Sequence, residues 1–328
     1  MKVSFVALLL LCTCLESFAG PTADTTKNTS RDSVRILSLN GPSGIALARL
    51  AADSPVISET RIVTGIVPSV DVLLPQLLNG DAIAGVLPPN VAAKLYNRSP
   101  GSIVLCAVIG NGMLSVLSVK ADVKSFDDLA GSVLYSTGSG STPEYLFREI
   151  QARRNGRSSD TEIDFSLSPA EVATALVSGK IEHALLPEPF ATVALMKASS
   201  SNRPVYRAIP ASEMSRAAGF SGDYPMTVFV ARSEIARNDP ELLNGILDRV
   251  EKSILWTNEN PAEAGRVAER AGLGITAAVT EASIPSCNLV YSPASEARDR
   301  IERLLSVFLS RSPESVGGSL PDEGFYLK

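Results

Sequence analysis

Two short loops of small and hydroxyl-bearing residues are suited to holding a polar group of a small molecule. The first loop is Asn40, Gly41, Pro42 and Ser43, and the second is Ser136, Thr137, Gly138 and Ser139. Each follows an apolar, strand-like run and precedes a helical pattern. Free backbone N–H groups at a helix start, aided by the helix dipole, can hold a carboxylate, sulfonate or phosphate. Ordinary helix capping by serine and threonine is the alternative explanation.

Glu188 is the charged residue that most invites a binding role, because Pro187 and Pro189 restrict its backbone. If its carboxylate faces a buried site, it needs a donor or a cation as partner, since an unpaired buried ion is costly. An amine on the ligand would supply that partner, and a solvated surface carboxylate is the alternative. No arginine falls within these loops, so a strongly anionic ligand would lack a bidentate clamp. The pattern favours a neutral, zwitterionic or amine-bearing solute.

Other candidate ligand contacts are polar, small or aromatic residues near expected strand ends. Asn90, after Pro89, offers both a donor and an acceptor. A helix N-cap would use the same side chain. Gly112, Met113 and Tyr224 are expected to line the same pocket, with core packing as the alternative for the methionine.

Catalytic and metal chemistry are poorly supported. His183 is the only histidine and lies in an apolar strand pattern, typical of a hydrogen-bonded core residue. A nucleophile at Ser43 or Ser139 would need it as base, and no nucleophile-elbow motif surrounds either serine. No Cys-x-x-Cys pair exists, which excludes a metal site built on histidine and cysteine. We expect no enzyme activity, no cofactor and no metal.

Composition indicates a globular chain that does not bind nucleic acid. The 328 residues are 45% hydrophobic and 20% charged, enough for two lobes with cores of their own. The net charge of -5 and the lack of a lysine or arginine run remove the electrostatic footprint of a nucleic-acid binder.

The N-terminus predicts export. Lys2 precedes an apolar run over 3–15, and a small-x-small site ends at Ala19. The run is too short for a membrane span, which needs about 20 residues. We therefore expect a signal peptide over 1–19 and a flexible polar tether over 20–32.

The cysteines leave two points open. Cys14 is a candidate lipidation site, which would anchor the protein to a membrane surface instead of cleavage after Ala19. Cys106 and Cys287 remain after processing, and two buried thiols are the simpler expectation than a long-range disulfide.

Strand and helix patterns alternate along the chain. Strand patterns cover 34–39, 61–66 and 82–87, and helical patterns cover 44–52 and 70–77. This rhythm predicts an α/β fold with a parallel sheet and helices on both faces. It recurs with a strand over 129–135, a helix that begins at Pro143 and another that ends at Gly179.

Matching landmarks suggest two similar lobes. Gly80 and Gly179 lie 99 positions apart, as do Pro88 and Pro187, and the loops at Gly41 and Gly138 lie 97 apart. These loops follow strand ends, where open α/β sheets bind ligands, so two such lobes would close like a clamshell. Coincidence is the alternative, because glycine and proline punctuate any α/β chain.

The C-terminal part is expected to return to the first lobe. A strand pattern over 226–231 precedes helical patterns over 240–258, 261–271 and 293–309. We expect lobe I to comprise 33–118 and 226–328, and lobe II to comprise 119–225. Hinges are expected near Val119-Lys120 and Tyr224-Met226.

Several stretches, in this order, carry a resemblance to a known family. They are Leu77-Leu78-Asn79-Gly80-Asp81, Leu87-Pro88-Pro89-Asn90, Phe126-Asp127-Asp128-Leu129-Ala130-Gly131, Pro187-Glu188-Pro189-Phe190, Pro240-Glu241-Leu242-Leu243 with Trp256, Asn260 and Pro261, and Gly317-Gly318-Ser319-Leu320-Pro321-Asp322 with Phe325-Tyr326. Over roughly 33–328 the chain resembles the nitrate/sulfonate/taurine and thiamine-pyrimidine type of ABC-transporter substrate-binding protein. It departs from the family pattern at His183 and in having Phe190 where tryptophan is usual.

This resemblance implies a type II periplasmic-binding-protein clamshell with a hinge. It implies capture of a small organic solute, such as an amine-bearing heterocycle or a sulfonate, outside the cytoplasmic membrane. The partners would be ABC permease and ATPase subunits, and a monomer is the simplest state. Two alternatives stay open: a lyase-type or biosynthetic enzyme on the same two-lobed fold, and a ligand-sensing surface protein. The export signal argues against the enzymes.

Overall fold

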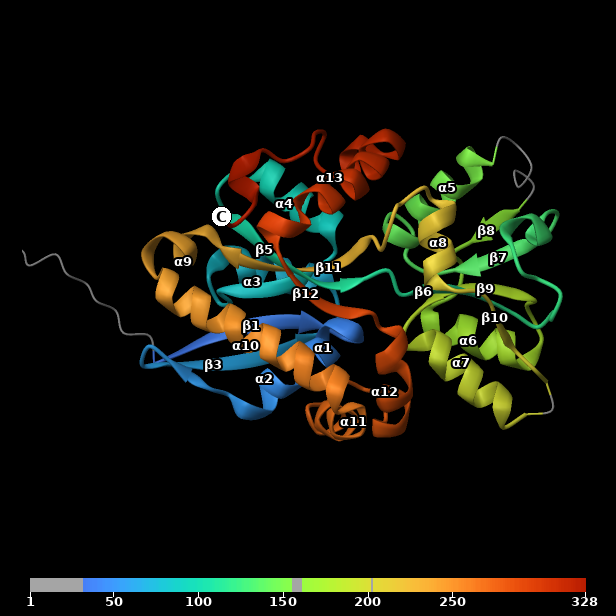
Figure 1. The fold of residues 1–328 in the computed structure, drawn as a ribbon, viewed down its shortest axis with the longest axis horizontal. Coiled ribbons are helices and arrows are strands. Elements are labelled where there is room, and N and C mark those ends of the chain that lie inside the picture. Colours follow the sequence, from blue (N-terminus) through green and yellow to red (C-terminus); the bar gives the residue numbers. More distant parts are fainter. Residues whose placement is uncertain (1–31, 155–160, 202) are drawn as a thin grey trace, which may run out of the picture. The chain divides into compact units, whose positions relative to one another are not determined.

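The computed structural model describes residues 32–154, 161–201 and 203–328 (Figure 1). The expected signal peptide over 1–19, its alternative lipidation site Cys14 and nearly all of the expected tether lie outside these residues. Within the part of the chain that the structure describes, no helix is both long and apolar enough to cross a bilayer.

Within the described residues, the first lobe is built on a seven-stranded sheet. Its strands, in spatial order, are β12 (Leu289–Pro293), β5 (Ile103–Asn111), β11 (Pro225–Arg232), β4 (Ala84–Leu87), β1 (Ser33–Leu39), β3 (Thr60–Val67) and β2 (Val56–Ile57). Strand β1 pairs in parallel with β3 and β4, whereas β11, β5, β12 and β2 pair antiparallel with their neighbours. The expected parallel arrangement is thus confirmed for β1, β3 and β4, and the antiparallel strands added at both sides make the whole sheet mixed.

Helices cover both faces of this sheet. One face carries α3 (Val70–Asn79), α4 (Pro89–Arg98) and α13 (Ala294–Arg311). The other carries α1 (Pro42–Ala46), α2 (Ala48–Asp53), α9 (Ser233–Asn238), α10 (Pro240–Glu259) and α11 (Pro261–Arg270). The lobe also contains α12 (Ala277–Ser283) and the 3₁₀ turns η2 (Ile284–Ser286), η3 (Pro313–Ser315) and η4 (Glu323–Phe325).

The second lobe is built on a five-stranded sheet within the described ranges. Its order is β10 (Tyr206–Ile209), β6 (Leu114–Ser118), β9 (His183–Pro187), β7 (Val133–Ser136) and β8 (Glu162–Asp164). Helices α5 (Thr142–Arg153) and α8 (Ala211–Ala217) pack on one face, and α6 (Pro169–Ser178) and α7 (Phe190–Ser199) on the other. The turn η1 (Phe126–Leu129) precedes β7, which therefore starts four residues later than the expected 129.

The expected similarity of the two lobes is confirmed by their topology. Strands β7, β8 and β9 repeat the parallel arrangement of β1, β3 and β4, with an antiparallel strand next to β9 as next to β4. Gly80 and Gly179 both end the helix between the second and third of these strands, with φ of 89° and 72°. Only glycine adopts this left-handed conformation without a steric penalty, which explains the repeated landmark.

The chain crosses between lobes earlier than expected. Strand β6, Leu114–Ser118, belongs to the five-stranded sheet, so the first crossing is Gly112-Met113 and not Val119-Lys120. Residues 114–118 thus join the second lobe. The return crossing precedes β11, which begins at Pro225 and agrees with the expected position.

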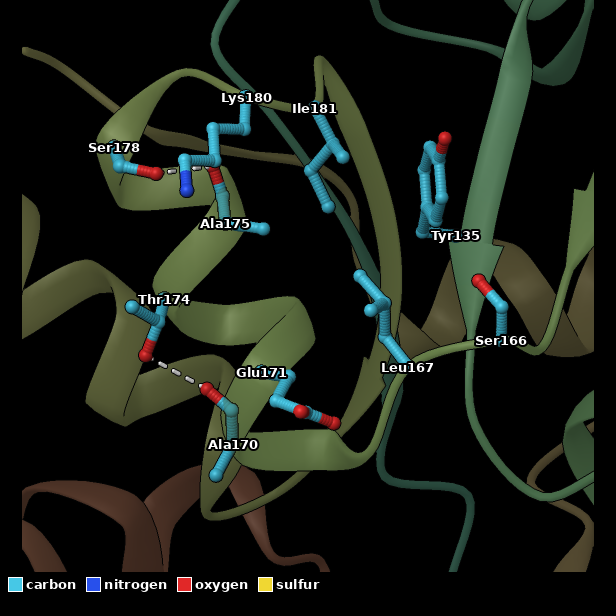
Figure 2. A pocket seen from close by; sticks show the side chains of 10 residues that line it. All are labelled: Tyr135, Ser166, Leu167, Ala170, Glu171, Thr174, Ala175, Ser178, Lys180 and Ile181. Carbon is cyan, nitrogen blue, oxygen red and sulfur yellow. Dashed lines mark hydrogen bonds between the residues drawn. The ribbon is translucent and has the colours of Figure 1, made fainter.

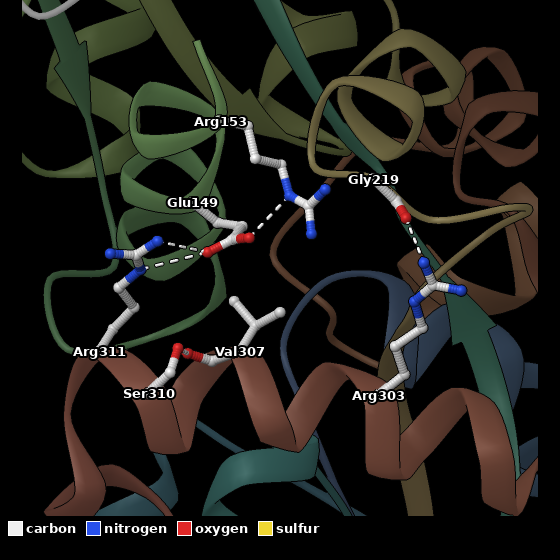
Figure 3. A network of polar contacts seen from close by, with 7 residues as sticks. All are labelled: Glu149, Arg153, Gly219, Arg303, Val307, Ser310 and Arg311. Atoms are coloured by element: carbon white, nitrogen blue, oxygen red, sulfur yellow. Dashed lines mark hydrogen bonds and ion pairs between the residues drawn. The ribbon is translucent and has the colours of Figure 1, made fainter. Parts of the chain in front are cut away.

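One layer of packed side chains continues from lobe to lobe. The rings of Tyr145 in α5 and Phe308 in α13 lie 5.2 Å apart within a common apolar cluster. Figure 3 shows polar contacts made by residues of the same two helices, α5 and α13. Glu149 of α5, only 8% exposed, accepts hydrogen bonds from Arg153 (2.7 Å) and from Arg311 of α13 (2.6 Å). Arg303 of α13 donates to the Gly219 carbonyl.

The Glu149 network yields a pH-dependent stability prediction. Burial alone would raise the pKa of Glu149, but hydrogen bonds from Arg311 and Arg153 hold it below its ordinary value of 4.5. A carboxylate with a lowered folded-state pKa stabilises the fold above its unfolded pKa, and this contribution is lost as pH falls through the folded pKa. Glu149→Gln should lower the free energy of unfolding by about 2 kcal/mol at pH 7, measured by urea denaturation.

The matched control is Glu263→Gln. Glu263 pairs with Arg266 and Arg270, but all three side chains are largely exposed, so the loss should be much smaller than that of Glu149→Gln. The gap between Glu149→Gln and the parent should narrow as pH falls below about 4. A gap that stays constant with pH would contradict an ionised, paired Glu149.

Candidate functional site

The first crossing holds the carboxyl ends of the two sheets face to face. Strand β5 runs in the direction of β4 and ends at Asn111, at the carboxyl edge of the first sheet. Strand β6 begins at Leu114, which pairs with Pro187 at the carboxyl end of β9. A residue spans at most about 3.6 Å, so these edges cannot separate by more than about 11 Å at the crossing.

One contact joins expected loops of the two lobes, and two more hold residues of the crossings. A side-chain carbon added at Gly41 would lie 3.7 Å from Cδ of Pro189, in ordinary contact distance. The Glu188 backbone N–H donates to the Met113 carbonyl at 3.2 Å. A carbon added at Gly112 would come within 2.5 Å of the Tyr224 ring, so only glycine fits there. That these residues touch a ligand stays a prediction.

Glu188 is buried and already paired within the chain. It is 1% exposed, and its Oε2 accepts from the Thr192 hydroxyl (2.7 Å) and backbone N–H (3.1 Å). Its Oε1 accepts from Nη2 of Arg207 at 2.7 Å, and Nη1 of Arg207 donates to Ser115 at 2.6 Å. The alternative of a solvated carboxylate is therefore wrong, and Arg207 supplies the cation that a buried Glu188 needs. That Glu188 contacts a ligand stays a prediction.

Arg207 is the functional residue that sequence reasoning missed. It lies in β10, nineteen positions after Glu188, and no local motif connects the two. The connection arises because β10 pairs with β6 and β6 pairs with β9. The one signal available in the sequence is a lone arginine in the short strand-like run Tyr206–Ile209.

The serine- and glycine-rich loop before α5 has its own internal anion. Oε2 of Glu144 accepts from the Gly140 backbone N–H at 2.8 Å and from the Ser139 hydroxyl at 3.1 Å. Burial raises the pKa of Glu144, but these bonds and one from Arg148 outweigh it and lower the pKa below its ordinary value. Glu144 thus occupies the Ser139 hydroxyl in this arrangement, and a ligand contact at Ser139 stays a prediction.

The other loop residues divide into buried and exposed groups. Ser43 and Ser136 are buried and donate to the carbonyls of Leu39 and Leu185. Ser43 therefore does not cap α1, whose N-cap position is held by Gly41 without a side-chain capping bond. The remaining expected contacts are buried or half-buried at Gly41, Pro42, Pro89 and Thr137, and exposed at Asn40 and Gly138.

Two asparagines at the carboxyl edge of the first sheet are buried without partners. Asn90, in the first turn of α4, is 4% exposed, and Asn111, at the end of β5, is 5% exposed. The Oδ1 atom of each is sealed from solvent and accepts no hydrogen bond from any described residue. Asn90 was expected from sequence, whereas Asn111 was missed because it reads as the last residue of an apolar strand. The N-cap alternative for Asn90 is wrong, since Pro88 holds that position.

The residues considered for catalysis have structural roles. His183 is 2% exposed, and its Nδ1 lies 3.1 Å from the Ser118 hydroxyl, which confirms the core interpretation. Cys106 and Cys287 are free and buried, as expected. Burial raises the pKa of Cys106 to about 12. Burial and then the nearby Glu188 carboxylate do the same for Cys287. Across the described ranges, no group of three or more metal-ligating side chains could hold an ion.

A separate hollow of about 580 Å³ lies on the second lobe (Figure 2). Its walls include Tyr135, the loop at Leu167 and one side of α6, and none of the expected ligand contacts. The hydroxyls of Thr174 and Ser178 are used within α6, on the carbonyls of Ala170 and Ala175. This hollow therefore lacks the unpartnered polar groups that distinguish the facing sheet edges.

Two α/β lobes with repeated topology, short crossings and facing carboxyl edges define the two-lobed fold of periplasmic solute-binding proteins. The chain belongs to the NMT1/THI5-like family, whose model matches residues 98–264, about half of the sequence. No curated protein sequence matches the chain.

Solved structures support the same fold. An ABC transporter protein from Parabacteroides distasonis is 26% identical, with a TM-score of 0.77, covering 90% of this chain and 99% of that one. The periplasmic aliphatic sulphonate binding protein SsuA from Escherichia coli is 16% identical, with a TM-score of 0.69 and coverage of 91% and 93%. The desulfurization enzyme DSZB is 15% identical, with a TM-score of 0.58 and coverage of 88% and 94%.

The Glu188–Arg207 pair gives a stability prediction. Arg207→Met would leave Glu188 buried without its cation, which should cost about 3–5 kcal/mol of unfolding free energy in the ligand-free protein. Urea denaturation measures the loss. Adding Glu188→Leu to Arg207→Met should restore most of it, because the unpaired charge is then gone.

The control for this pair is Lys252→Met, which breaks an exposed ion pair with Asp248 and should cost less than about 0.5 kcal/mol. If Arg207→Met were equally mild, Glu188 would not depend on Arg207, and the earlier idea of a ligand amine would regain force.

Proposed function

We propose that the chain is the extracytoplasmic solute-binding component of an ABC importer, capturing a small organic solute between its two lobes. The observation that carries this proposal is the meeting of the two carboxyl sheet edges, with Gly41 against Pro189 and buried polar groups on both sides. Open α/β sheets bind ligands at this edge. The structural likeness to an ABC transporter protein over 90% of the chain supports the same conclusion.

In this mechanism the second lobe rotates about the two crossings. The apolar contact between Tyr145 and Phe308 lies in the same buried cluster as Leu114 and Tyr224 beside the crossings, so that side would act as the pivot. The contact between Gly41 and Pro189, and that between α12 and α7, lie on other elements and would form the mouth. A solute shifts the balance only if it binds the closed arrangement more tightly than the open one.

The proposal includes export and partners. The charged and apolar N-terminus supports a signal peptide over 1–19 or, alternatively, lipidation at Cys14. An exported protein of this fold would deliver its solute as a monomer to permease and ATPase subunits.

We favour binding over catalysis although DSZB is an enzyme of similar fold. Fold does not determine chemistry, so the residues must decide. His183 is buried on Ser118, Ser139 is bonded to Glu144, and both thiols have raised pKa values. None of these side chains combines an available nucleophile with a base.

Thermal unfolding of the mature chain against a panel of solutes tests the function. The protein would first be unfolded and refolded to remove any carried ligand. A solute at 100 times its dissociation constant should stabilise the fold by about 2.7 kcal/mol, which raises Tm by several degrees. Small-angle X-ray scattering with the same solute should show a smaller radius of gyration if the lobes close.

The panel would hold sulfonates, nitrate, amino acids, amides, nucleobases and vitamins. A solute that raises Tm and is recovered unchanged supports binding, whereas a solute converted into product would establish the enzyme alternative. Stabilisation without any change in the radius of gyration would contradict the closing mechanism.

A further inference from the structure

We propose that the site between the facing sheet edges selects an uncharged solute that presents N–H or O–H donors. The side-chain oxygens of Asn90 and Asn111 would accept hydrogen bonds from these donors. This inference rests on the proposed function and narrows its ligand class. It separates this chain from SsuA, the aliphatic sulphonate binding protein described above.

The first step concerns the two buried acceptors. The Oδ1 atoms of Asn90 and Asn111 lie at the carboxyl ends of β4 and β5, two strands separated by β11 alone. An amide buried without a hydrogen bond has lost its water without compensation, which native cores avoid. Two such groups at one sheet edge therefore point to a solute that supplies the missing donors. Carboxylate, nitrate and sulfonate oxygens have no proton to donate and would face these carbonyl oxygens unfavourably.

The second step concerns the charge of the site. Arg207 is the cation bonded to a side chain at this edge, and both its Nη atoms are engaged, by Glu188 and by Ser115. The Glu188–Arg207 pair is neutral as a unit. The loops that follow the strands, at 40–43, 88–90, 111–113, 136–141 and 187–189, contain no lysine or arginine. An anion entering this space would have no unengaged cation among these residues to replace its hydration.

The third step concerns the internal anion. Glu144 already occupies the donors of Gly140 and Ser139 at the start of α5. A ligand anion would have to displace this carboxylate, which also pairs with Arg148 at 2.7 Å, to reach those donors. The sheet edge thus offers the two unpaired acceptors of Asn90 and Asn111 to a ligand, whereas the donors of Gly140 and Ser139 serve the chain's own carboxylate.

The test uses variants of similar side-chain size that should raise the stability of the ligand-free protein and at the same time weaken solute binding. Asn111→Leu removes an unsatisfied buried amide, so the ligand-free variant should melt about 1–3 °C higher than the parent. The same change should weaken solute binding at least tenfold, because one acceptor is lost. Asn90→Leu should behave in the same way. A merely structural asparagine would instead show a lower Tm and unchanged binding.

The control variant is Asn97→Leu. The Asn97 amide donates to the carbonyls of Val316 and Ser319, both at 2.7 Å, away from the sheet edges. Its loss should lower Tm in the ligand-free protein and leave solute binding within twofold of the parent.

The probe is a small-molecule extract of cultured bacteria, dialysed against the refolded full mature protein. Retained solutes would be identified by mass spectrometry in positive and negative ion modes. Retention of an uncharged donor-bearing solute, lost in Asn111→Leu and kept in Asn97→Leu, is the expected result. Retention of a sulfonate, phosphate or carboxylate would overturn the inference and leave the binding function standing. If the parent retains nothing at all, the binding function fails and the inference fails with it.

Discussion

The structure depends on the short crossing between the two sheets. Only Gly112 and Met113 separate the end of β5 from the start of β6, and these strands lie at the carboxyl edges of different sheets. Because this link is so short, the two sheet edges stay close together at the crossing even when the lobes move apart elsewhere. Gly112 is required at this point because the Tyr224 ring packs directly against its α-carbon.

The same constraint explains why charges at the site are arranged in neutral units. Facing edges exclude water, and an ion without a partner there would destabilise the closed arrangement strongly. Glu188 is accordingly matched by Arg207, and Glu144 by backbone and hydroxyl donors of its own loop. Both carboxylates thus have partners within the chain, whereas the Oδ1 atoms of Asn90 and Asn111 and the Tyr224 hydroxyl are buried without a partner among the described residues. Binding a solute would then satisfy the groups that folding left unsatisfied.

The alternation of strands and helices and the doubled landmarks were predictable because they are local. Gly80 and Gly179 indicate helix ends in the left-handed conformation. Hydrophobic periodicity predicts β1, β3, β4 and their counterparts. The antiparallel strands were less predictable. Strand β11 reads as an apolar run in either direction, and its pairing with β4 and β5 is decided by partners more than a hundred positions away.

By itself, the sequence determined the α/β class, the two similar lobes, the core position of His183 and the loops at the sheet edges, because periodicity and turn chemistry act over a few residues. Only the tertiary structure decided which buried charges meet and which buried amides do not. Arg207 reaches Glu188 through two strand pairings, and Oδ1 of Asn111 has no donor among the residues that the structure describes. Such pairs join residues that are distant in the chain. Whether a hydrogen bond or an ion pair forms depends on a few ångströms of separation, and no local sequence pattern encodes that distance.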